Sequence, residues 1–220
     1  LSGWNYISYP RYFPEEVDVV FSDVQDNIKL LKDDSGNLYW PELGINTIGE
    51  MEAGEGYILK VFNSQEFIYP SNSDNVDAVD GNTTVERFGF TAPVHYSNIQ
   101  ITNSNMVIGL PADAWIDFDV EYGDELAVLD SEGSLVGVSV LENNNNVVVI
   151  WGNDSSLNSK DGMLDGEIFS IELWEESSNK TFTIEFEWQE GVDYFNTNGV
   201  NIASVITTQE KYDYILKYVL

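Results

Sequence analysis

The sequence predicts a mainly β protein, in which a small α+β module is followed by a β-sandwich with a short C-terminal helix. Many short apolar segments are separated by turn residues, such as those at 130–133, a pattern typical of β-sandwiches. Residues 182–188 alternate between large apolar side chains and Thr or Glu, as expected for a strand with one buried face. Apolar residues with helical spacing occur at residues 17–24 and 207–220.

The first predicted module covers residues 1–70 and combines several strands with one short helix. Pro14 and the two acidic residues after it suit the first turn of a helix, because its dipole favours negative charge there. The buried face of this helix is expected to consist of Val17, Val20, Phe21 and Val24. The predicted strands are residues 4–9, 28–32, 38–40 and 56–62.

An acidic linker, residues 71–87, is predicted to separate this module from a β-sandwich domain at residues 88–206. The linker is rich in Asp, Asn and Ser and has no large apolar residue apart from valines, which is typical of a connecting segment. Residues 147–150 are continuously apolar, which predicts a central strand buried on both faces. The predicted strands of the domain are residues 99–102, 106–110, 125–130, 135–141, 147–151, 168–174 and 181–188.

Residues 207–220 are predicted to form an amphipathic C-terminal helix. Residues 207–210 have the sequence Thr-Thr-Gln-Glu, which fits a capping box. We expect the helix to dock on the molecule itself, with docking on a partner as the alternative. Its apolar face would consist of Tyr212, Ile215, Leu216 and Val219.

The composition excludes several functional classes. The chain has 38 acidic and 9 basic residues, one histidine and no cysteine, for a formal net charge of −29. Nucleic acid is therefore not an expected partner, because phosphate binding needs clustered cations. Membrane insertion is not expected, because no apolar stretch has the length of a membrane span. The single histidine, His95, is expected to be a packing or surface residue, and no catalytic motif occurs, so we do not expect an enzyme.

The best candidate for a metal site is the loop of residues 153–167, which lies between two predicted strands. Ca²⁺ takes about six to eight oxygen ligands, and closely spaced carboxylates on a glycine-containing loop can supply them. The loop departs from the EF-hand pattern, because Ser159 stands in place of its glycine. The alternative is a solvated turn region without a metal. The candidate Ca²⁺ ligands are Asp154, Asp161, Asp165 and Glu167.

Aromatic residues are dense near the start of the chain, and they allow two interpretations. Exposed rings can stack on sugars while neighbouring polar side chains bind the hydroxyl groups, which would make a carbohydrate-binding module. Alternatively the rings fill the core, because a domain of about 70 residues without disulfides needs large apolar side chains to fold. The residues concerned are Trp4, Tyr6, Tyr9, Tyr12, Phe13, Tyr39 and Trp40.

Two groups of segments carry a resemblance to known modules. The first group starts with Trp-Asn and ends with Gly-Glu-Gly-Tyr; it comprises residues 3–8, 41–49 and 54–57. The second comprises residues 123–137, 151–154 and 161–167. Together they resemble modules of secreted, multidomain surface proteins of marine Bacteroidetes and of related virion proteins of marine phages. The resemblance implies an extracellular adhesive or structural role, and it supplies no catalytic residue.

These observations together predict a structural or interaction module of an extracellular assembly, such as a surface layer, filament, adhesin or virion shell. The expected partners are copies of the chain itself or other extracellular proteins, which would pair with exposed strand edges. A carbohydrate-binding module that takes polysaccharide is the alternative. A glycoside hydrolase is a third and weaker candidate, because 38 acidic residues make any single carboxylate pair uninformative.

Overall fold

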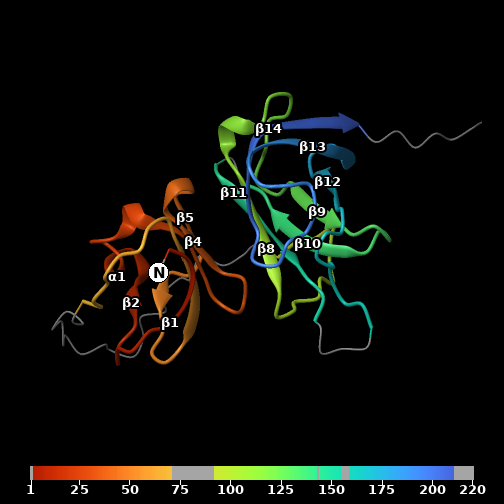
Figure 1. Ribbon diagram of the computed structural model, residues 1–220. Coiled ribbons are helices and arrows are strands. Elements are labelled where there is room, and N and C mark those ends of the chain that lie inside the picture. Colours follow the sequence, from red (N-terminus) through yellow and green to blue (C-terminus); the bar gives the residue numbers. More distant parts are fainter. Residues whose placement is uncertain (1, 71–91, 143, 155–158, 211–220) are drawn as a thin grey trace, which may run out of the picture. The chain divides into compact units, whose positions relative to one another are not determined.

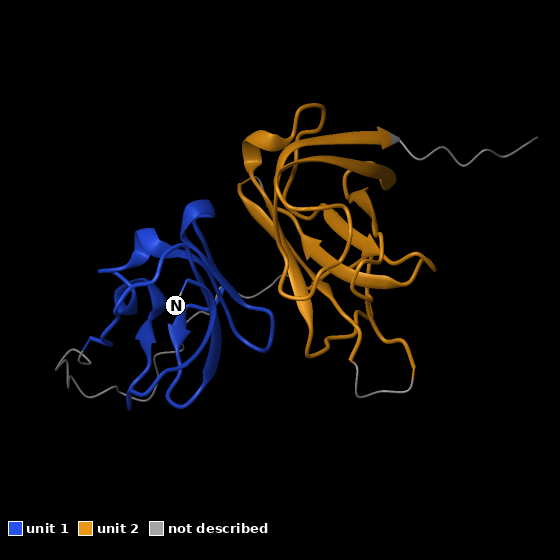
Figure 2. Cartoon of the chain, viewed as in Figure 1, with its two compact units in different colours: residues 1–90 blue, residues 91–220 orange. Residues whose placement is uncertain are grey.

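The computed structural model describes residues 2–70, 92–142, 144–154 and 159–210. The protein is mainly β (Figure 1), as predicted. It divides into two compact units, residues 1–90 and 91–220 (Figure 2), so the division lies just past the predicted linker at residues 71–87. The linker itself falls outside the described residues. None of the described helices has the length or the apolar composition needed to cross a bilayer.

The first unit is built on a five-stranded antiparallel sheet in the order β1-β7-β3-β4-β5. The predicted strands 28–32 and 38–40 are confirmed with the same bounds. The sheet consists of β1 (Gly3–Ser8), β7 (Gly56–Val61), β3 (Ile28–Lys32), β4 (Leu38–Trp40) and β5 (Ile45–Asn46), and a separate pair is formed by β2 (Glu15–Glu16) and β6 (Glu50–Met51).

The predicted helix of the first unit is present but short, since α1 spans Val17–Val20 only. The expected first turn at Pro14 and the two acidic residues is wrong, because Glu15 and Glu16 form β2 and pair with β6. Ser22 Oγ donates to the Val19 carbonyl at 3.0 Å, a local bond that competes with further helical turns. The expected apolar face is otherwise confirmed, because Val17, Val20 and Phe21 are buried in one core with residues of the sheet. Two short 3₁₀ turns complete the unit, η1 (Gln25–Asn27) and η2 (Pro41–Leu43).

The second unit is a closed seven-stranded barrel in the order β10-β11-β8-β14-β13-β12-β9. Figure 1 shows these strands curving around one interior. All neighbouring strands are antiparallel except β14 and β8, which are parallel. The strands are β8 (Asn105–Leu110), β9 (Glu125–Leu129), β10 (Leu135–Val140), β11 (Asn146–Trp151), β12 (Ser170–Glu175), β13 (Lys180–Glu190) and β14 (Val200–Glu210), and η3 spans Ala112–Ala114.

Three predictions for this unit need correction or lack confirmation. The β-sandwich is not confirmed, because the strands close into one sheet. The expected strand at 99–102 is irregular. The helix predicted for 207–220 is wrong at residues 207–210, which belong to β14 and pair with β13 up to Phe182↔Glu210; the rest of that segment lies outside the described residues. The long pairing with β13 satisfies backbone groups that a capping box would have satisfied within a helix.

The barrel interior explains the apolar pattern of its strands. Side chains from all seven strands form one buried core. In β13 the predicted alternation is confirmed, with Ile184 buried and Glu185 and Glu187 exposed. In β11 the prediction of two buried faces is only partly correct, because Val148 and Ile150 are buried whereas Val147 and Val149 are half-buried.

The same turn closes one hairpin in each unit, β3–β4 and β9–β10. In the first, Asp33 Oδ1 accepts the N–H groups of Ser35 and Asn37 at 2.9 and 2.8 Å. In the second, Asp130 Oδ1 accepts those of Glu132 and Ser134 at 2.9 and 2.7 Å. The fourth residue of each turn is a glycine with positive φ, 89° and 83°, a conformation that favours glycine. The turn predicted at residues 130–133 is therefore confirmed, and in both hairpins an aspartate carboxylate binds two backbone N–H groups.

Candidate functional site

The loop that carries the predicted Ca²⁺ ligands has well-anchored ends. Asn153 N donates to the Met163 carbonyl at 2.7 Å, and Met163 N donates to the Trp151 carbonyl at 3.0 Å. The two chain segments approach so closely that a Cβ on Gly162 would lie 2.4 Å from the Gly152 carbonyl oxygen. Glycine is therefore required at this crossing, and the loop leaves and re-enters the barrel at fixed points.

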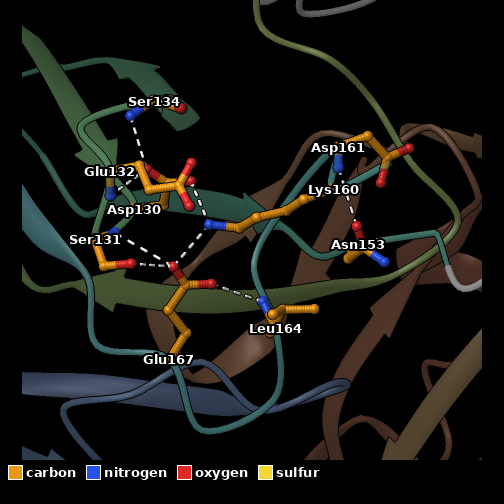
Figure 3. A network of polar contacts seen from close by, with 9 residues as sticks. All are labelled: Asp130, Ser131, Glu132, Ser134, Asn153, Lys160, Asp161, Leu164 and Glu167. Atoms are coloured by element: carbon orange, nitrogen blue, oxygen red, sulfur yellow. Dashed lines mark hydrogen bonds and ion pairs between the residues drawn. The ribbon is translucent and has the colours of Figure 1, made fainter. Parts of the chain in front are cut away.

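An ion-pair network occupies the middle of this region (Figure 3). Lys160 Nζ donates to Asp130 Oδ2 at 2.7 Å and to Glu167 Oε1 at 2.8 Å. Glu167 also accepts from Ser131 Oγ at 2.6 Å and from Leu164 N at 3.0 Å. An ammonium group thus lies between two carboxylates, and it joins the β9–β10 turn to the loop.

The network shifts the pKa of each member in the direction that keeps it charged. Burial by itself would raise the pKa of Glu167, but the Leu164 N–H, the Lys160 ammonium and the Ser131 donors outweigh it and lower that pKa to about 2. Burial is likewise outweighed at Asp130, whose pKa is lowered by Lys160 and two backbone N–H groups. The pKa of Lys160 is raised, because its bonds to both carboxylates outweigh burial. The network is therefore charged throughout the neutral range.

Of the other three candidate ligands, Asp154 and Asp161 are joined to each other by a hydrogen bond, whereas Asp165 bonds elsewhere. Asp161 Oδ1 accepts the Asp154 N–H at 2.8 Å, and Asp165 Oδ1 accepts the Thr197 N–H at 2.7 Å. Within the described ranges, no three acidic or histidine side chains are grouped as metal ligands would be. The structure thus places Glu167 with Lys160 and not with the three aspartates, and Ca²⁺ binding stays a prediction that a chelation experiment can test.

The aromatic residues near the start of the chain separate into buried and exposed sets. Tyr9, Tyr39 and Trp40 are buried in the first unit, so the core interpretation is correct for them. Tyr6 and Tyr12 are 81% and 91% exposed. The remaining two residues of the set differ, because Trp4 is half-buried and Phe13 is exposed.

Trp4 lies among cations, which the sequence pattern does not indicate. The Nζ atoms of Lys32 and Lys60 lie 5.1 and 5.5 Å from the centre of its ring, within the range of cation–π attraction. Burial, and then the charge of Lys60, lower the pKa of Lys32 to about 8. In this strongly acidic chain, Lys32 on β3 and Lys60 on β7 thus place positive charge beside Trp4 of β1.

His95 lies in a small docking site on the second unit. The N–H groups of Val94, His95 and Tyr96 donate to the buried carboxylate of Glu125 on β9. The imidazole stacks on Trp174, with ring centres 4.6 Å apart. These contacts attach the segment before the barrel to its surface, in line with the predicted packing role of His95.

Strand β1 forms one edge of the first sheet and, among the described strands, has unpaired backbone groups on its outer side, as its register with β7 shows. Tyr9 N donates to the Glu55 carbonyl at 3.0 Å, and the register continues as Ser8↔Gly56 through Gly3↔Val61. Because hydrogen-bonded pairs alternate along an antiparallel ladder, Gly3, Asn5 and Ile7 bond to β7, whereas the backbone groups of the residues between them point away. Within the described part of the chain, no strand pairs with β1 on that outer side.

No family model matches this chain, and neither the curated proteins nor the solved structures contain a match.

Proposed function

We propose that the chain is a structural or interaction module of an extracellular assembly, and that it joins its neighbours by strand pairing along β1. The observation that carries this proposal is the outer edge of β1, where Trp4, Tyr6 and Ser8 direct their N–H groups away from the sheet. The Trp4 and Tyr6 carbonyls point the same way, whereas the Ser8 carbonyl accepts Tyr69 OH at 2.9 Å. Such a row of donors and acceptors is a template for another strand.

The composition of β1 supports this use of its edge. Proteins that avoid edge pairing commonly place charged residues, Pro or bulges on edge strands. β1 has the sequence Gly-Trp-Asn-Tyr-Ile-Ser, without charge or proline, and its register with β7 runs without a bulge. Within β1 itself, the charged residues, prolines and bulges that oppose addition of a strand are therefore absent.

The second unit offers less opportunity for pairing, because its sheet is closed. β14 pairs with β8 only from Val200 to Ile202. Further along, residues 115–117 cover β14: Ile116 N donates to the Ile206 carbonyl at 3.3 Å, and Asp117 accepts the Thr208 N–H at 3.0 Å. This difference between the units is the reason for assigning assembly to the first one.

Net charge sets the conditions under which pairing would occur. Copies of a chain with a charge of −29 repel one another, and salt screens this repulsion over about 10 Å at 0.1 M ionic strength. The cations beside Trp4 lower the local repulsion at β1. Assembly is therefore expected to strengthen from low to physiological salt. The acidic composition and the resemblance to secreted surface modules support a location on a cell surface or virion.

The test is the size distribution of the purified protein by light scattering and negative-stain microscopy. The wild-type chain should form oligomers or filaments at physiological salt and dissociate at low salt. Tyr6→Pro should remain monomeric, because proline removes an outward N–H group and leaves the bonds of Asn5 and Ile7 to β7 in place. Tyr6→Ala is the matched control and should assemble, since it keeps that N–H group.

Two results would contradict the proposal. One is a wild-type monomer at high protein concentration across the salt series, with and without Ca²⁺. The other is equal assembly of the wild type and Tyr6→Pro. If Tyr6→Ala fails to assemble as well, the tyrosine ring and not the backbone makes the contact.

A carbohydrate-binding module is the second candidate function, and the exposed rings of Tyr6 and Tyr12 favour it. Exposed aromatic rings provide stacking surfaces for sugars, and an uncharged polysaccharide would not be repelled by the acidic surface. A glycan array separates the two candidates. Saturable binding that is lost in Tyr6→Ala and Tyr12→Ala, by a chain that stays monomeric, would favour carbohydrate binding.

A further inference from the structure

The first unit contains a cavity of about 460 Å³ that takes no part in strand pairing at the outer edge of β1. It lies against the inner side of the main sheet, where β1, β3 and β7 contribute to its lining. The opposite side is formed by residues after α1 and by residues 63–69. The lining consists of Asn5, Ile7, Ser8, Pro10, Phe21, Val24, Asn27, Ile28, Leu59, Val61, Asn63, Gln65, Phe67 and Tyr69. Its volume falls within the range of small-molecule sites, about 300–1,000 Å³.

The wall made by residues 63–69 is held in place by specific contacts. Asn27 Nδ2 donates to the Asn63 carbonyl and to Gln65 Oε1, both at 2.9 Å, and Asn63 N donates back to Asn27 Oδ1 at 2.9 Å. Phe67 stacks on Phe21 with ring centres 5.0 Å apart. These contacts hold residues 63–69 in place at both ends. Specific contacts therefore keep the cavity between this segment and the sheet open.

The chemistry of the lining defines the ligand. None of the lining residues is Asp, Glu, Lys, Arg or His, although the chain has 38 acidic and 9 basic residues. A charged ligand would lose its hydration there without gaining a counter-ion. Most lining residues are aliphatic or aromatic, and the polar ones are mainly amides.

We propose that this cavity binds an uncharged, mainly apolar small molecule that carries a hydrogen-bonding group. Ile28, Leu59 and Phe67 provide contact area for its apolar body. A hydroxyl or carbonyl group on the ligand has amide partners in Asn63 and Gln65. This binding is separate from strand pairing at the outer edge of β1, and neither proposal depends on the other.

The test uses two fluorescent probes of similar ring structure on the full chain. N-phenyl-1-naphthylamine is uncharged, and 1-anilinonaphthalene-8-sulfonate is an anion. The uncharged probe should bind saturably at one site per chain, at least tenfold more tightly than the anion. Chemical-shift mapping of the wild-type protein should place the probe at the amides of Ile7, Val24 and Phe67.

Two tryptophan variants provide the structural control. Val24→Trp puts a large ring into the cavity and should weaken binding of the uncharged probe at least tenfold. Val19→Trp adds the same ring on α1 at a site that is 50% exposed and outside the lining, and it should bind as the wild type does. Circular dichroism checks that both variants are folded. If Val24→Trp is unfolded, chemical-shift mapping of the wild-type protein decides whether the probe binds in the cavity.

Several outcomes would overturn the inference. These are the absence of saturable binding, equal affinity for the anionic probe, shifts confined to other parts of the chain, and unchanged binding by folded Val24→Trp. Displacement of the probe by a neutral oligosaccharide would also overturn it, because the ligand would then be a polar sugar. None of these outcomes alters the expected behaviour of Tyr6→Pro, so the two proposals fail independently.

Discussion

Replacing Lys160 by Met should destabilise the second unit at neutral pH. The substitution keeps much of the side-chain volume but removes the ammonium that bonds to Asp130 and Glu167 at 2.7 and 2.8 Å. The two carboxylates would then lose their shared counter-ion. Their bonds to the backbone N–H groups of the turn and of Leu164 would remain, which limits the damage.

The magnitude follows from the pKa of Glu167. Lowering that pKa from 4.5 to about 2 corresponds to about 3 kcal/mol at 1.36 kcal/mol per unit. Solvent screens part of this interaction, and the Leu164 and Ser131 donors supply part of the shift. We therefore expect Lys160→Met to lose about 1–2 kcal/mol, which is a decrease in melting temperature of about 3–6 °C for a chain of this size.

The effect should depend on pH in a defined direction. Glu167 and Asp130 have lower pKa values in the folded than in the unfolded state, so their stabilisation is present above the unfolded values near 4 and is lost as the pH falls toward 2. Lys160 has a raised pKa, so its contribution persists through neutral pH. The difference between wild type and Lys160→Met should thus be full at pH 7 and shrink steadily below pH 4.5.

Differential scanning calorimetry at a series of pH values measures this difference directly. Lys160→Arg is the matched control, because it keeps a positive charge between the two carboxylates, and it should lose less stability than Lys160→Met. Equal melting temperatures for the two variants at pH 7 would refute the reasoning. So would a difference between wild type and Lys160→Met that is as large at pH 2.5 as at pH 7.

Three further predictions concern other parts of the chain. Glu125→Gln should lower the free energy of unfolding by about 2 kcal/mol, because a neutral amide replaces a buried carboxylate that accepts three backbone N–H groups. Hydrogen exchange at residues 94–96 should accelerate, and unchanged exchange would count against this prediction. Lys32→Met should stabilise the protein by about 1–3 kcal/mol at pH 7. The pKa of Lys32 is lowered to about 8 in the folded state, so holding its charged form in the fold costs free energy at neutral pH. The gain should vanish by pH 11, where the lysine is neutral in both states, and urea titrations at the two pH values measure it. If Ca²⁺ binds the loop at 153–167, millimolar Ca²⁺ should raise the melting temperature relative to excess chelator, whereas identical melting curves would exclude that site.

Local patterns predicted those elements whose stability is local. Residues 28–32 and 38–40 form strands because a turn directly joins them, and Asp33 organises that turn through bonds to two N–H groups within four residues. The same holds for the turn at Asp130. The alternation in β13 was also predictable, because a strand with one face on a core places every second side chain inward.

Elements that depend on distant partners were not predictable in this way. Residues 207–210 have a helix-start sequence, yet they pair with β13 more than twenty residues earlier, as Phe182↔Glu210 shows. The candidate metal loop illustrates the same limit. Spacing along the chain grouped Glu167 with three aspartates, whereas the fold brings it to Lys160 and to Ser131 of a different hairpin.

The sequence by itself determined the mainly β composition, the hairpin turns, the inward-facing residues of β13 and the strongly acidic charge. Secondary-structure propensity, turn chemistry and the alternation of apolar and polar residues each act over a few neighbouring residues. The sequence alone therefore predicts the features that depend on them. Only the tertiary structure decided that the second unit closes into a barrel, that Lys160 forms ion pairs with two carboxylates, and that, among the described strands, none pairs with the outer edge of β1. These features depend on which distant strands become neighbours, and that choice is made by the burial of the whole core.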